Sequence, residues 1–463
     1  MSVHESYPGP PGGPIVFSYE QIRCLEEANI FLPEPQTNTS PNPSGKRKVS
    51  AAFSAQSLSN SSSTSASSSS ASISTHGFQP HVIQTFDIPI AEESIEVLEY
   101  IGFIPDVARL IYGRYCDRPN PTQNPDDLMA YVSGHLASLK SRHYDNVAPK
   151  EALRYAGLNP QIQDAITDPR FSHIFGTETL EHWAKDTVET NYAALLSQQK
   201  LLQRDANQRM ARNKNHKRAR HEPHRNEQQQ LQSPVTATIN ITPKDFQFPE
   251  NNVTVRSDVQ ILDNHVSLFK GKSFYELSQP GDIIEPDGSV DLSPLRTHPG
   301  GDFNWNFNAH YWTPDKQTAE EYRKFAERRC PTAESCVIHI QIPRAFVDSL
   351  RREDLWFSRD WKEYVWTSRT EKKPDKKFDY LWKPGQADVV QGPICSAIST
   401  KIARIRQEDV QSTINEDHVM RLPNGKKASQ WVFVQTDSVS QLAEELKGKM
   451  HFTIFEAVAH LST

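Results

Sequence analysis

The sequence predicts an α+β domain at the C-terminus, an all-α domain before it, and a disordered tail at the N-terminus. Residues 1–78 are rich in Pro and Gly and then in Ser, and such a segment buries too little apolar surface to fold. Residues 79–203 carry apolar side chains at helical spacing, whereas residues 245–463 combine helices with strands of alternating pattern. Residues 204–244 are basic and then polar, and we assign them to a helix end and a linker.

The composition agrees with this division into folded and solvated parts. The chain has 463 residues, of which 36% are hydrophobic, so two folded domains with linkers are expected. The five cysteines form no CxxC pair and no Cys/His metal spacing, which predicts reduced thiols and no metal site. No apolar run reaches the length of a membrane span, so we expect an intracellular protein without a membrane partner.

One island interrupts the predicted tail. The stretch YEQIRCLEEANIFL, which begins at Tyr19, predicts a short amphipathic helix. Two interpretations stay open for it, a docking peptide and a transient helix that has no partner. The remaining Ser-rich segment is typical of a eukaryotic protein that is regulated by modification.

Several short helices and one long helix are expected in the all-α domain. The short helices are predicted at 94–101, from Pro105, and at 126–140, 149–156 and 160–166. The long helix keeps one apolar stripe through Trp183, Val188 and Leu195, as a member of a helical bundle does. No metal spacing connects the histidines His135, His143, His173 and His182. Nothing in this domain predicts catalysis.

Basic residues gather where the long helix loses its apolar stripe. Between Arg204 and Arg225 there are eight Lys or Arg residues and two acidic residues. Lys217, Arg218 and Arg220 form a cluster typical of a nuclear localisation signal, which an import receptor binds, or of a phosphate-contacting patch. The alternative is a solvated helix end, where cations are favoured by the helix dipole. We expect a nuclear rather than a cytoplasmic protein.

Strands and helices follow one another irregularly in the C-terminal domain. The predicted strands are 266–269, 309–312, 336–342, 387–390, 431–435 and 451–455. The predicted helices are 314–329, 343–350 and 438–446. Because the helices do not separate the strands regularly, an α+β arrangement fits better than a doubly wound sheet.

A tight junction between a strand and a helix is predicted at Thr313. This threonine is a suitable N-cap, Pro314 suits the first helical position, and Asp315 places negative charge at the helix start. Tyr311 therefore lies at a strand end, where a side chain can face a ligand. The alternative for an aromatic residue at such a place is a position in the core.

Six sequence pieces follow one another in the C-terminal domain. They are Leu268-Phe269-Lys270-Gly271, Asp302-Phe303, His310-Tyr311-Trp312-Thr313 with the next helix, Trp361 to Val365 as a turn closed by Arg369, Asp388 to Ile394, and Gln430 to Thr436. In this order they resemble a family of unknown function within the ADP-ribosyltransferase superfamily, whose members cleave the nicotinamide–ribose bond of NAD. The resemblance implies two packed β-sheets with flanking helices in the C-terminal domain, and it does not extend to the rest of the chain.

The resemblance implies that NAD is the substrate, and it assigns roles to individual residues. Glu363 is implied to be the catalytic carboxylate, which stabilises positive charge at the ribose as in glycoside hydrolysis. Tyr311 is implied to stack on the nicotinamide as a second catalytic residue, and Lys270 to bind the adenosine-side ribose. Gly271 is implied to let the dinucleotide approach closely, and Thr313 to contact it as well.

Other interpretations of these residues stay open. The superfamily usually has His or Arg at the position of Lys270, and a lysine lacks their planar donor geometry. Glu363, next to Lys362, is alternatively part of a surface ion pair, which stabilises a protein little. Further candidates near the same predicted cleft are Asp302, His298 and His310.

The favoured function is that of an NAD-dependent ADP-ribosyltransferase that modifies an unidentified protein or nucleic acid. The alternative is an inactive transferase fold that serves as an interaction module in a nuclear scaffold, with its basic helix against nucleic acid. The enzymatic interpretation requires Glu363 and Tyr311 to line one cavity that accepts a dinucleotide.

Overall fold

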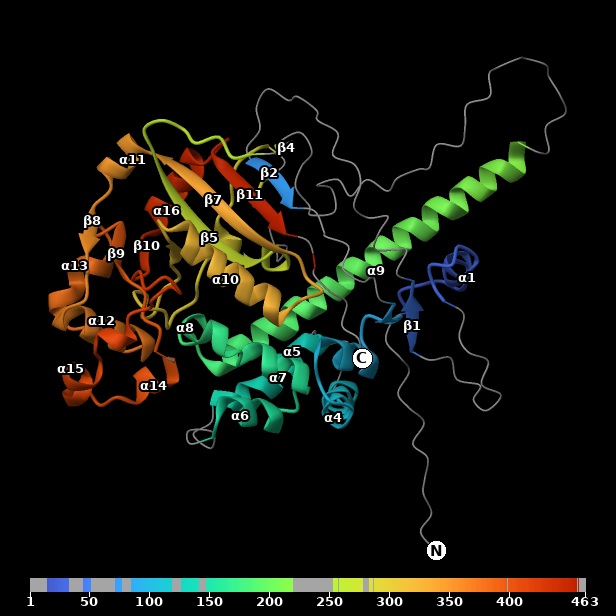
Figure 1. Cartoon of the computed structure of the whole chain (residues 1–463), viewed down its shortest axis with the longest axis horizontal. Coiled ribbons are helices and arrows are strands. Elements are labelled where there is room, and N and C mark those ends of the chain that lie inside the picture. Colours follow the sequence, from blue (N-terminus) through green and yellow to red (C-terminus); the bar gives the residue numbers. More distant parts are fainter. Residues whose placement is uncertain are drawn as a thin grey trace, which may run out of the picture.

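The computed structural model describes residues 15–32, 45–50, 71–76, 85–118, 126–140, 147–219, 253–256, 258–277, 283–285, 287–397, 399–455 and 457. This part of the chain is a mixed α/β structure with two mixed sheets and flanking helices (Figure 1). The helices of the N-terminal half gather on one side of the sheets. The long helix α9 (Leu180–Ala219) begins beside them and projects beyond the body of the molecule (Figure 1).

The short helices of the N-terminal half lie close to the predicted ranges. They are α3 (Ile95–Ile101), α4 (Pro105–Cys116), α5 (Leu128–Leu136) with the 3-10 turn Ala137–Lys140, α6 (Pro149–Tyr155), α7 (Pro160–Ile166) and α8 (Ser172–Phe175). Ser94, Asp127 and Asn159 cap three of them, since each side chain accepts a hydrogen bond from a backbone N–H three residues on. Gly102 ends α3 at a φ of 125°, which favours glycine.

The larger sheet has five strands in the order β4-β2-β11-β7-β5. They are β4 (Val253–Val255), β2 (Ala71–His76), β11 (Met450–Phe455), β7 (Ser335–Pro343) and β5 (His265–Ser273). β7 pairs antiparallel with both β5 and β11, so β5 is an edge strand. Cys336, Ile338, Ile340 and Ile342 of β7 face the core that α11 (Arg344–Ser349) and α16 (Thr436–Glu445) cover.

The smaller sheet has four strands in the order β6-β10-β9-β8. They are β6 (His310–Trp312), β10 (Ser429–Phe433), β9 (Val389–Pro393) and β8 (Arg352–Asp354). A bridge between Phe269 and Thr313 joins the two sheets, because each residue donates its N–H to the carbonyl oxygen of the other. The edge strands β5 and β6 therefore meet at this point.

Helix α10 (Lys316–Arg329) packs on the face of the larger sheet opposite to α11 and α16. Its start differs from the prediction, because Asp315 is the N-cap and accepts a hydrogen bond from the N–H of Gln317. Thr313 instead closes a local turn, in which its hydroxyl oxygen accepts from the N–H of Asp315 at 3.2 Å. Asp315 is better placed than Thr313 because Thr313 is held by its pairing with Phe269.

Parts of the predicted disordered tail are ordered elements. Helix α1 (Tyr19–Glu27) packs on α9, β1 (Lys46–Val49) pairs with β3 (Phe86–Pro89), and β2 lies inside the larger sheet. In β2, Ala71 and Ile73 are buried in the core. Ser72 and Ser74 alternate with them and hydrogen bond to the ring of His451. The Ser-rich composition concealed β2, because its polar positions are serines that form hydrogen bonds within the sheet.

The helices of the N-terminal half pack directly on the C-terminal half. The rings of Phe171 and Trp183 lie 5.4 and 5.0 Å from the ring of Phe325 in α10. Arg329 forms an ion pair with Asp186 of α9 and donates to the hydroxyl of Thr187 at 2.9 Å. These contacts are buried, and side chains from both described parts belong to one apolar cluster.

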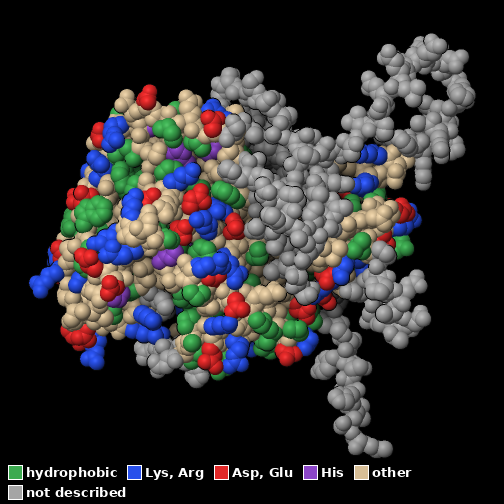
Figure 2. Space-filling view, viewed as in Figure 1, with side chains coloured by type: hydrophobic (Ala, Val, Ile, Leu, Met, Phe, Trp, Pro, Cys, Tyr) green, Lys and Arg blue, Asp and Glu red, His purple; other side chains and the backbone are tan. Residues whose placement is uncertain are grey.

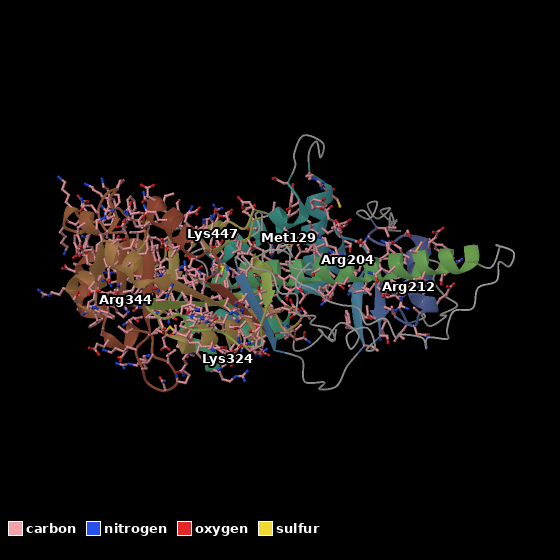
Figure 3. All side chains as sticks on the ribbon, turned by 90° about the horizontal axis from the view of Figure 1, so that it is seen from above. Met129, Arg204, Arg212, Lys324, Arg344 and Lys447 are labelled. Atoms are coloured by element: carbon pink, nitrogen blue, oxygen red, sulfur yellow. The ribbon has the colours of Figure 1, made fainter. Side chains whose placement is uncertain are left out.

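The surface carries both signs of charge. Figure 2 shows acidic and basic side chains interspersed over the visible described face, without a large area of one sign. Arg204 and Arg212 lie along the projecting part of α9 (Figure 3). The side chains of Lys217 and Arg218 and the whole of Arg220 lie outside the described residues. No described helix is both long and apolar enough to cross a lipid bilayer.

Candidate functional site

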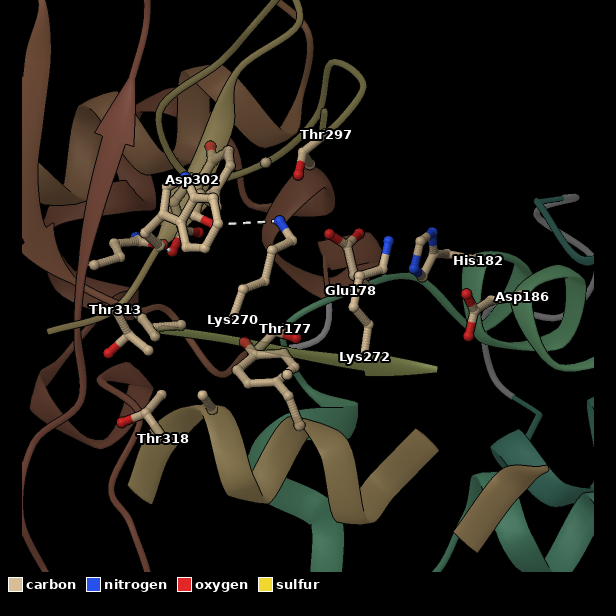
Figure 4. A pocket seen from close by; sticks show the side chains of 18 of the residues that line it. Thr177, Glu178, His182, Asp186, Lys270, Lys272, Thr297, Asp302, Thr313 and Thr318 are labelled. Atoms are coloured by element: carbon tan, nitrogen blue, oxygen red, sulfur yellow. Dashed lines mark hydrogen bonds between the residues drawn. The ribbon is translucent and has the colours of Figure 1, made fainter. Parts of the chain in front are cut away.

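A cavity of about 350 Å³ lies where the edge strands β5 and β6 meet (Figure 4). The loop before β6, helix α10 and the turn between α8 and α9 line its other sides. Its charged side chains include Glu178, His182, Asp186, Lys270, Lys272, Arg296, Asp302, Arg329 and Arg369. Its aromatic side chains are Trp183, Phe269, Tyr311, Trp312 and Tyr322.

Four residues that the sequence assigned to NAD line this cavity: Lys270, Gly271, Tyr311 and Thr313. The Nζ of Lys270 donates to the carbonyl oxygens of Leu295 and Tyr311, both at 3.2 Å. The Lys270 side chain therefore connects β5 to the backbone at Leu295 and at Tyr311, and it also lines the cavity. Its charge remains next to the cavity, where it attracts an anionic group.

The ring of Tyr311 is fixed by its own hydroxyl. That hydroxyl donates to Oδ1 of Asn304 at 2.8 Å and accepts from the N–H of Phe303 at 2.9 Å. Burial, and then the nearby charge of Asp302, raise the pKa of Tyr311 well above its usual value. The phenol is therefore a neutral ring of fixed orientation, suited to stacking and not to proton transfer near neutral pH.

Glycine is required at position 271 for a structural reason that the sequence did not reveal. A Cβ at this position would overlap with the backbone of Ala319 in α10, so the glycine lets the helix lie directly on β5. The close approach that the resemblance attributed to a dinucleotide is made here by the chain itself. Gly271 nevertheless lines the cavity beside Lys270.

A buried ion pair forms the floor of the cavity. We call Asp302, Arg369 and Gln430 the buried floor. Oδ1 of Asp302 accepts a hydrogen bond from Nε of Arg369 at 2.8 Å and lies 2.7 Å from Nη2 in the ion pair. Oδ2 accepts from Gln430 and from the N–H of Cys395, both at 2.8 Å. Burial alone would lower the pKa of Arg369, but Asp302 and the other acidic groups nearby, Glu178 among them, together outweigh burial, so the pKa is raised and the guanidinium stays charged. Three of the six sequence pieces therefore meet at this floor.

The other side of the cavity comes from the N-terminal half. We call Thr177, Glu178, His182, Trp183 and Asp186 the helical wall. Figure 4 shows Glu178 and Lys270 pointing into the same space. Burial raises the pKa of Glu178, whereas His182 and Arg369 act in the lowering direction. For Asp186, burial acts in the raising direction, but Arg329 outweighs it and the pKa is lowered.

The sequence analysis missed the helical wall. Glu178 stands between two threonines at the start of a helix, where an acidic residue is common because of the helix dipole. His182 was included among histidines without metal spacing. No local sequence pattern marks Glu178 as a site residue, because its place beside Tyr311 becomes visible only in the fold.

Glu363 does not line the cavity, which corrects the expectation that it and Tyr311 share one space. The piece around it is not a turn but helix α12 (Arg359–Arg369), capped by Ser358. Trp361, Tyr364 and Val365 are buried on the inner face of α12. Glu363 faces the other way and binds Nζ of Lys377 at 2.7 Å. The surface ion pair is thus present, with Lys377 rather than Lys362 as partner.

The further candidates divide between the cavity and the core. Asp302 and His298 line the cavity, and His298 is exposed at its rim. His310 is turned away, since its Nε2 lies 3.0 Å from the carbonyl oxygen of Leu292. Burial, and then the charge of Lys270, lower the pKa of His310 to about 4, so it is neutral near pH 7.

Neither a metal site nor a known relative identifies this cavity. Among the described residues, no group of three or more His, Cys, Asp or Glu side chains is placed to hold a metal ion. Comparisons with models of known protein families, with curated proteins and with solved structures found no match for the chain. The function must therefore be argued from the cavity itself.

Proposed function

We propose that the chain is an ADP-ribosyltransferase-like protein that binds NAD in this cavity. Because Glu363 lies outside the cavity, transfer of ADP-ribose to a macromolecular acceptor requires a carboxylate other than the one that the resemblance implied. The observation that carries the proposal is the convergence of Lys270, Gly271, Tyr311 and Thr313 on one cavity. The resemblance, which rests on the sequence alone, implies a contact with NAD for all four. Asp302, Arg369 and Gln430, which belong to three more of the matching pieces, lie directly beneath them.

The chemistry of the lining supports a dinucleotide ligand. A volume of about 350 Å³ lies within the range of roughly 300–1,000 Å³ that is usual for small-molecule sites. Lys270, Lys272 and Arg296 supply positive charge for a pyrophosphate. The fixed ring of Tyr311 offers a flat apolar face for nicotinamide, and Trp312 and Tyr322 add further aromatic surface.

Binding and turnover of NAD test this proposal. We expect titration calorimetry of the full chain to detect NAD binding, and Lys270→Met to weaken it at least about tenfold, because one charge-assisted contact contributes roughly 1.5–3 kcal/mol. Lys324→Met is the matched control, since Lys324 lies exposed on α10 and does not line the cavity. Release of nicotinamide from NAD measures the activity. A folded chain that does not bind NAD contradicts the proposal.

An interaction module without activity is the second proposal. Two observations favour it: Nζ of Lys270 is already hydrogen-bonded to two carbonyl groups, and Glu363 lies outside the cavity. A module of this kind would stay folded, release no nicotinamide and keep its partners after Lys270→Met. This second proposal is supported if Lys270→Met captures the same partners as the wild-type chain and neither protein releases nicotinamide.

We also propose nuclear import through the basic segment. The described part of α9 that leads to it projects from the body and carries Arg204 and Arg212 (Figure 3). Replacing Lys217, Arg218 and Arg220 by alanine in the full chain fused to a fluorescent protein should move it to the cytoplasm. Unchanged nuclear accumulation would contradict this proposal.

A further inference from the structure

Three carboxylates line the cavity, and two of them are held in ion pairs. Both oxygens of Asp302 accept hydrogen bonds, from Arg369 on one side and from Cys395 and Gln430 on the other. Asp186 is paired with Arg329, whose side chain is 3% exposed. Both carboxylates are therefore already engaged by arginine side chains of the protein.

Glu178 differs from both of them. Within the described part of the chain it forms no ion pair, although the charges of His182 and Arg369 lie near enough to act on its pKa in the lowering direction. It is half-buried and points into the space that Lys270 and Tyr311 also line (Figure 4). Burial raises its pKa, which brings the carboxyl closer to the range in which a general base works.

The backbone around Glu178 is held firmly against the C-terminal half. Gly176 lies so close to Ser396 that a Cβ would overlap with the carbonyl oxygen of Ser396. Trp183 donates its indole N–H to the carbonyl oxygen of Phe175 at 2.9 Å, which closes the turn between α8 and α9. Asp186 and Arg329 then fix the first turns of α9. The position of Glu178 is therefore set by packing on both sides.

We propose that Glu178 is the catalytic carboxylate of this site, supplied to the C-terminal cavity by the helical wall. The inference rests on the proposed function. The nicotinamide–ribose bond breaks and its electron pair leaves with nicotinamide, so positive charge develops at the ribose carbon. An acceptor oxygen or nitrogen then forms a bond to that carbon, and its proton passes to the carboxylate of Glu178. The products are nicotinamide, the ADP-ribosylated acceptor and one proton that returns to water.

The surroundings of Glu178 define the expected pH dependence. The titratable and charged groups that line the cavity with it are His182, Asp186, Lys270, Lys272, Arg296, His298, Asp302, Tyr311, Tyr322, Arg329 and Arg369. Because a base must be deprotonated, the rate of the wild-type chain should rise with pH as Glu178 ionises. His182 lies on the same wall and acts on the pKa of Glu178 in the lowering direction. The variant His182→Gln separates its contribution.

The experiment measures NAD binding and nicotinamide release for the full chain and for Glu178→Gln. We expect the dissociation constant for NAD to change by less than about threefold, and the release rate to fall at least about 100-fold, as is usual for loss of a general base. The rise of rate with pH should be absent in Glu178→Gln and retained in His182→Gln. Glu178→Asp should recover part of the rate. Glu408→Gln, exposed and outside the cavity, is the matched control.

Each other outcome separates the inference from the proposed function. If the wild-type chain does not bind NAD, the proposed function fails first and the inference with it. If NAD binds and nicotinamide is released at the same rate by Glu178→Gln, only the role of Glu178 is overturned. If NAD binds to the wild-type chain without nicotinamide release, a catalytic role for Glu178 is likewise overturned. A circular dichroism spectrum and retained NAD binding show that Glu178→Gln is folded.

Discussion

The buried floor and the helical wall face each other across one cavity, and they differ in how their charges are used. On the floor, Asp302 and Arg369 form an ion pair with side chains 3% and 1% exposed, and Gln430 and backbone groups bind their remaining polar atoms. On the wall, Glu178 is left without an ion-pair partner within the described residues. The buried floor therefore maintains the shape of the site, whereas the helical wall provides Glu178, a carboxylate that is not engaged in an ion pair.

The comparison shows that the order of motifs along the chain does not by itself identify which charged side chains meet in the cavity. The pieces that resemble the transferase family form the floor and the strands around it. The carboxylate that faces the same space comes from Glu178, in a region that the resemblance does not cover. The glutamate inside the matching pieces, Glu363, is paired on another surface.

The largest expected effect comes from breaking the floor. Asp302→Ala leaves the guanidinium of Arg369 buried without its partner, and we expect the free energy of unfolding to fall by about 3–5 kcal/mol. Urea titration followed by tryptophan fluorescence measures this change. Asp354→Ala, exposed on β8, is the control and should change stability by less than about 0.5 kcal/mol. If Asp302→Ala lowered the free energy of unfolding by less than about 1 kcal/mol, the buried floor would not be what holds the site in shape.

An intermediate effect is expected where the wall meets the C-terminal half. Gly176→Ala places a methyl group against the carbonyl oxygen of Ser396, and overpacking of this kind costs about 1–3 kcal/mol. The displaced turn carries Glu178, so nicotinamide release should fall together with stability. Gly113→Ala in α4 meets no atom within 4 Å and should be neutral or stabilising by up to about 1 kcal/mol. Full activity in Gly176→Ala would contradict the idea that packing positions Glu178.

The smallest effect is expected at the glutamate outside the cavity. Glu363→Gln removes a partly exposed pair with Lys377 and should reduce stability by less than about 1 kcal/mol. Nicotinamide release should stay near the wild-type rate. A fall comparable to that of Glu178→Gln would reverse the comparison and restore the role that the resemblance implied for Glu363.

The sequence predicted elements well where periodicity was strong. The strand through Ile338 and the long helix through Trp183 lie close to their predicted positions, because alternating and helical patterns of burial repeat over many residues. The strand at Ile73 was missed, because its polar face is made of serines that hydrogen bond to His451 across the sheet. Pairing between distant segments leaves no local signal.

The site was predictable on one side only. Lys270 and Tyr311 were found because they belong to an ordered set of pieces, and the structure places them within β5 and β6. Glu363 was misplaced because a short turn was expected where α12 forms, and on a helix this residue points away from Trp361 and Tyr364. Glu178 could not be found from local pattern, since only the packing of Gly176 on Ser396 brings it to the cavity.

A crystal structure of the full chain with a non-hydrolysable NAD analogue tests the central claim most directly. We predict that the nicotinamide lies against the ring of Tyr311, with a carboxylate oxygen of Glu178 within hydrogen-bond distance of the adjacent ribose. An analogue bound outside the cavity, or bound with Glu178 turned away from the ribose, would contradict the account.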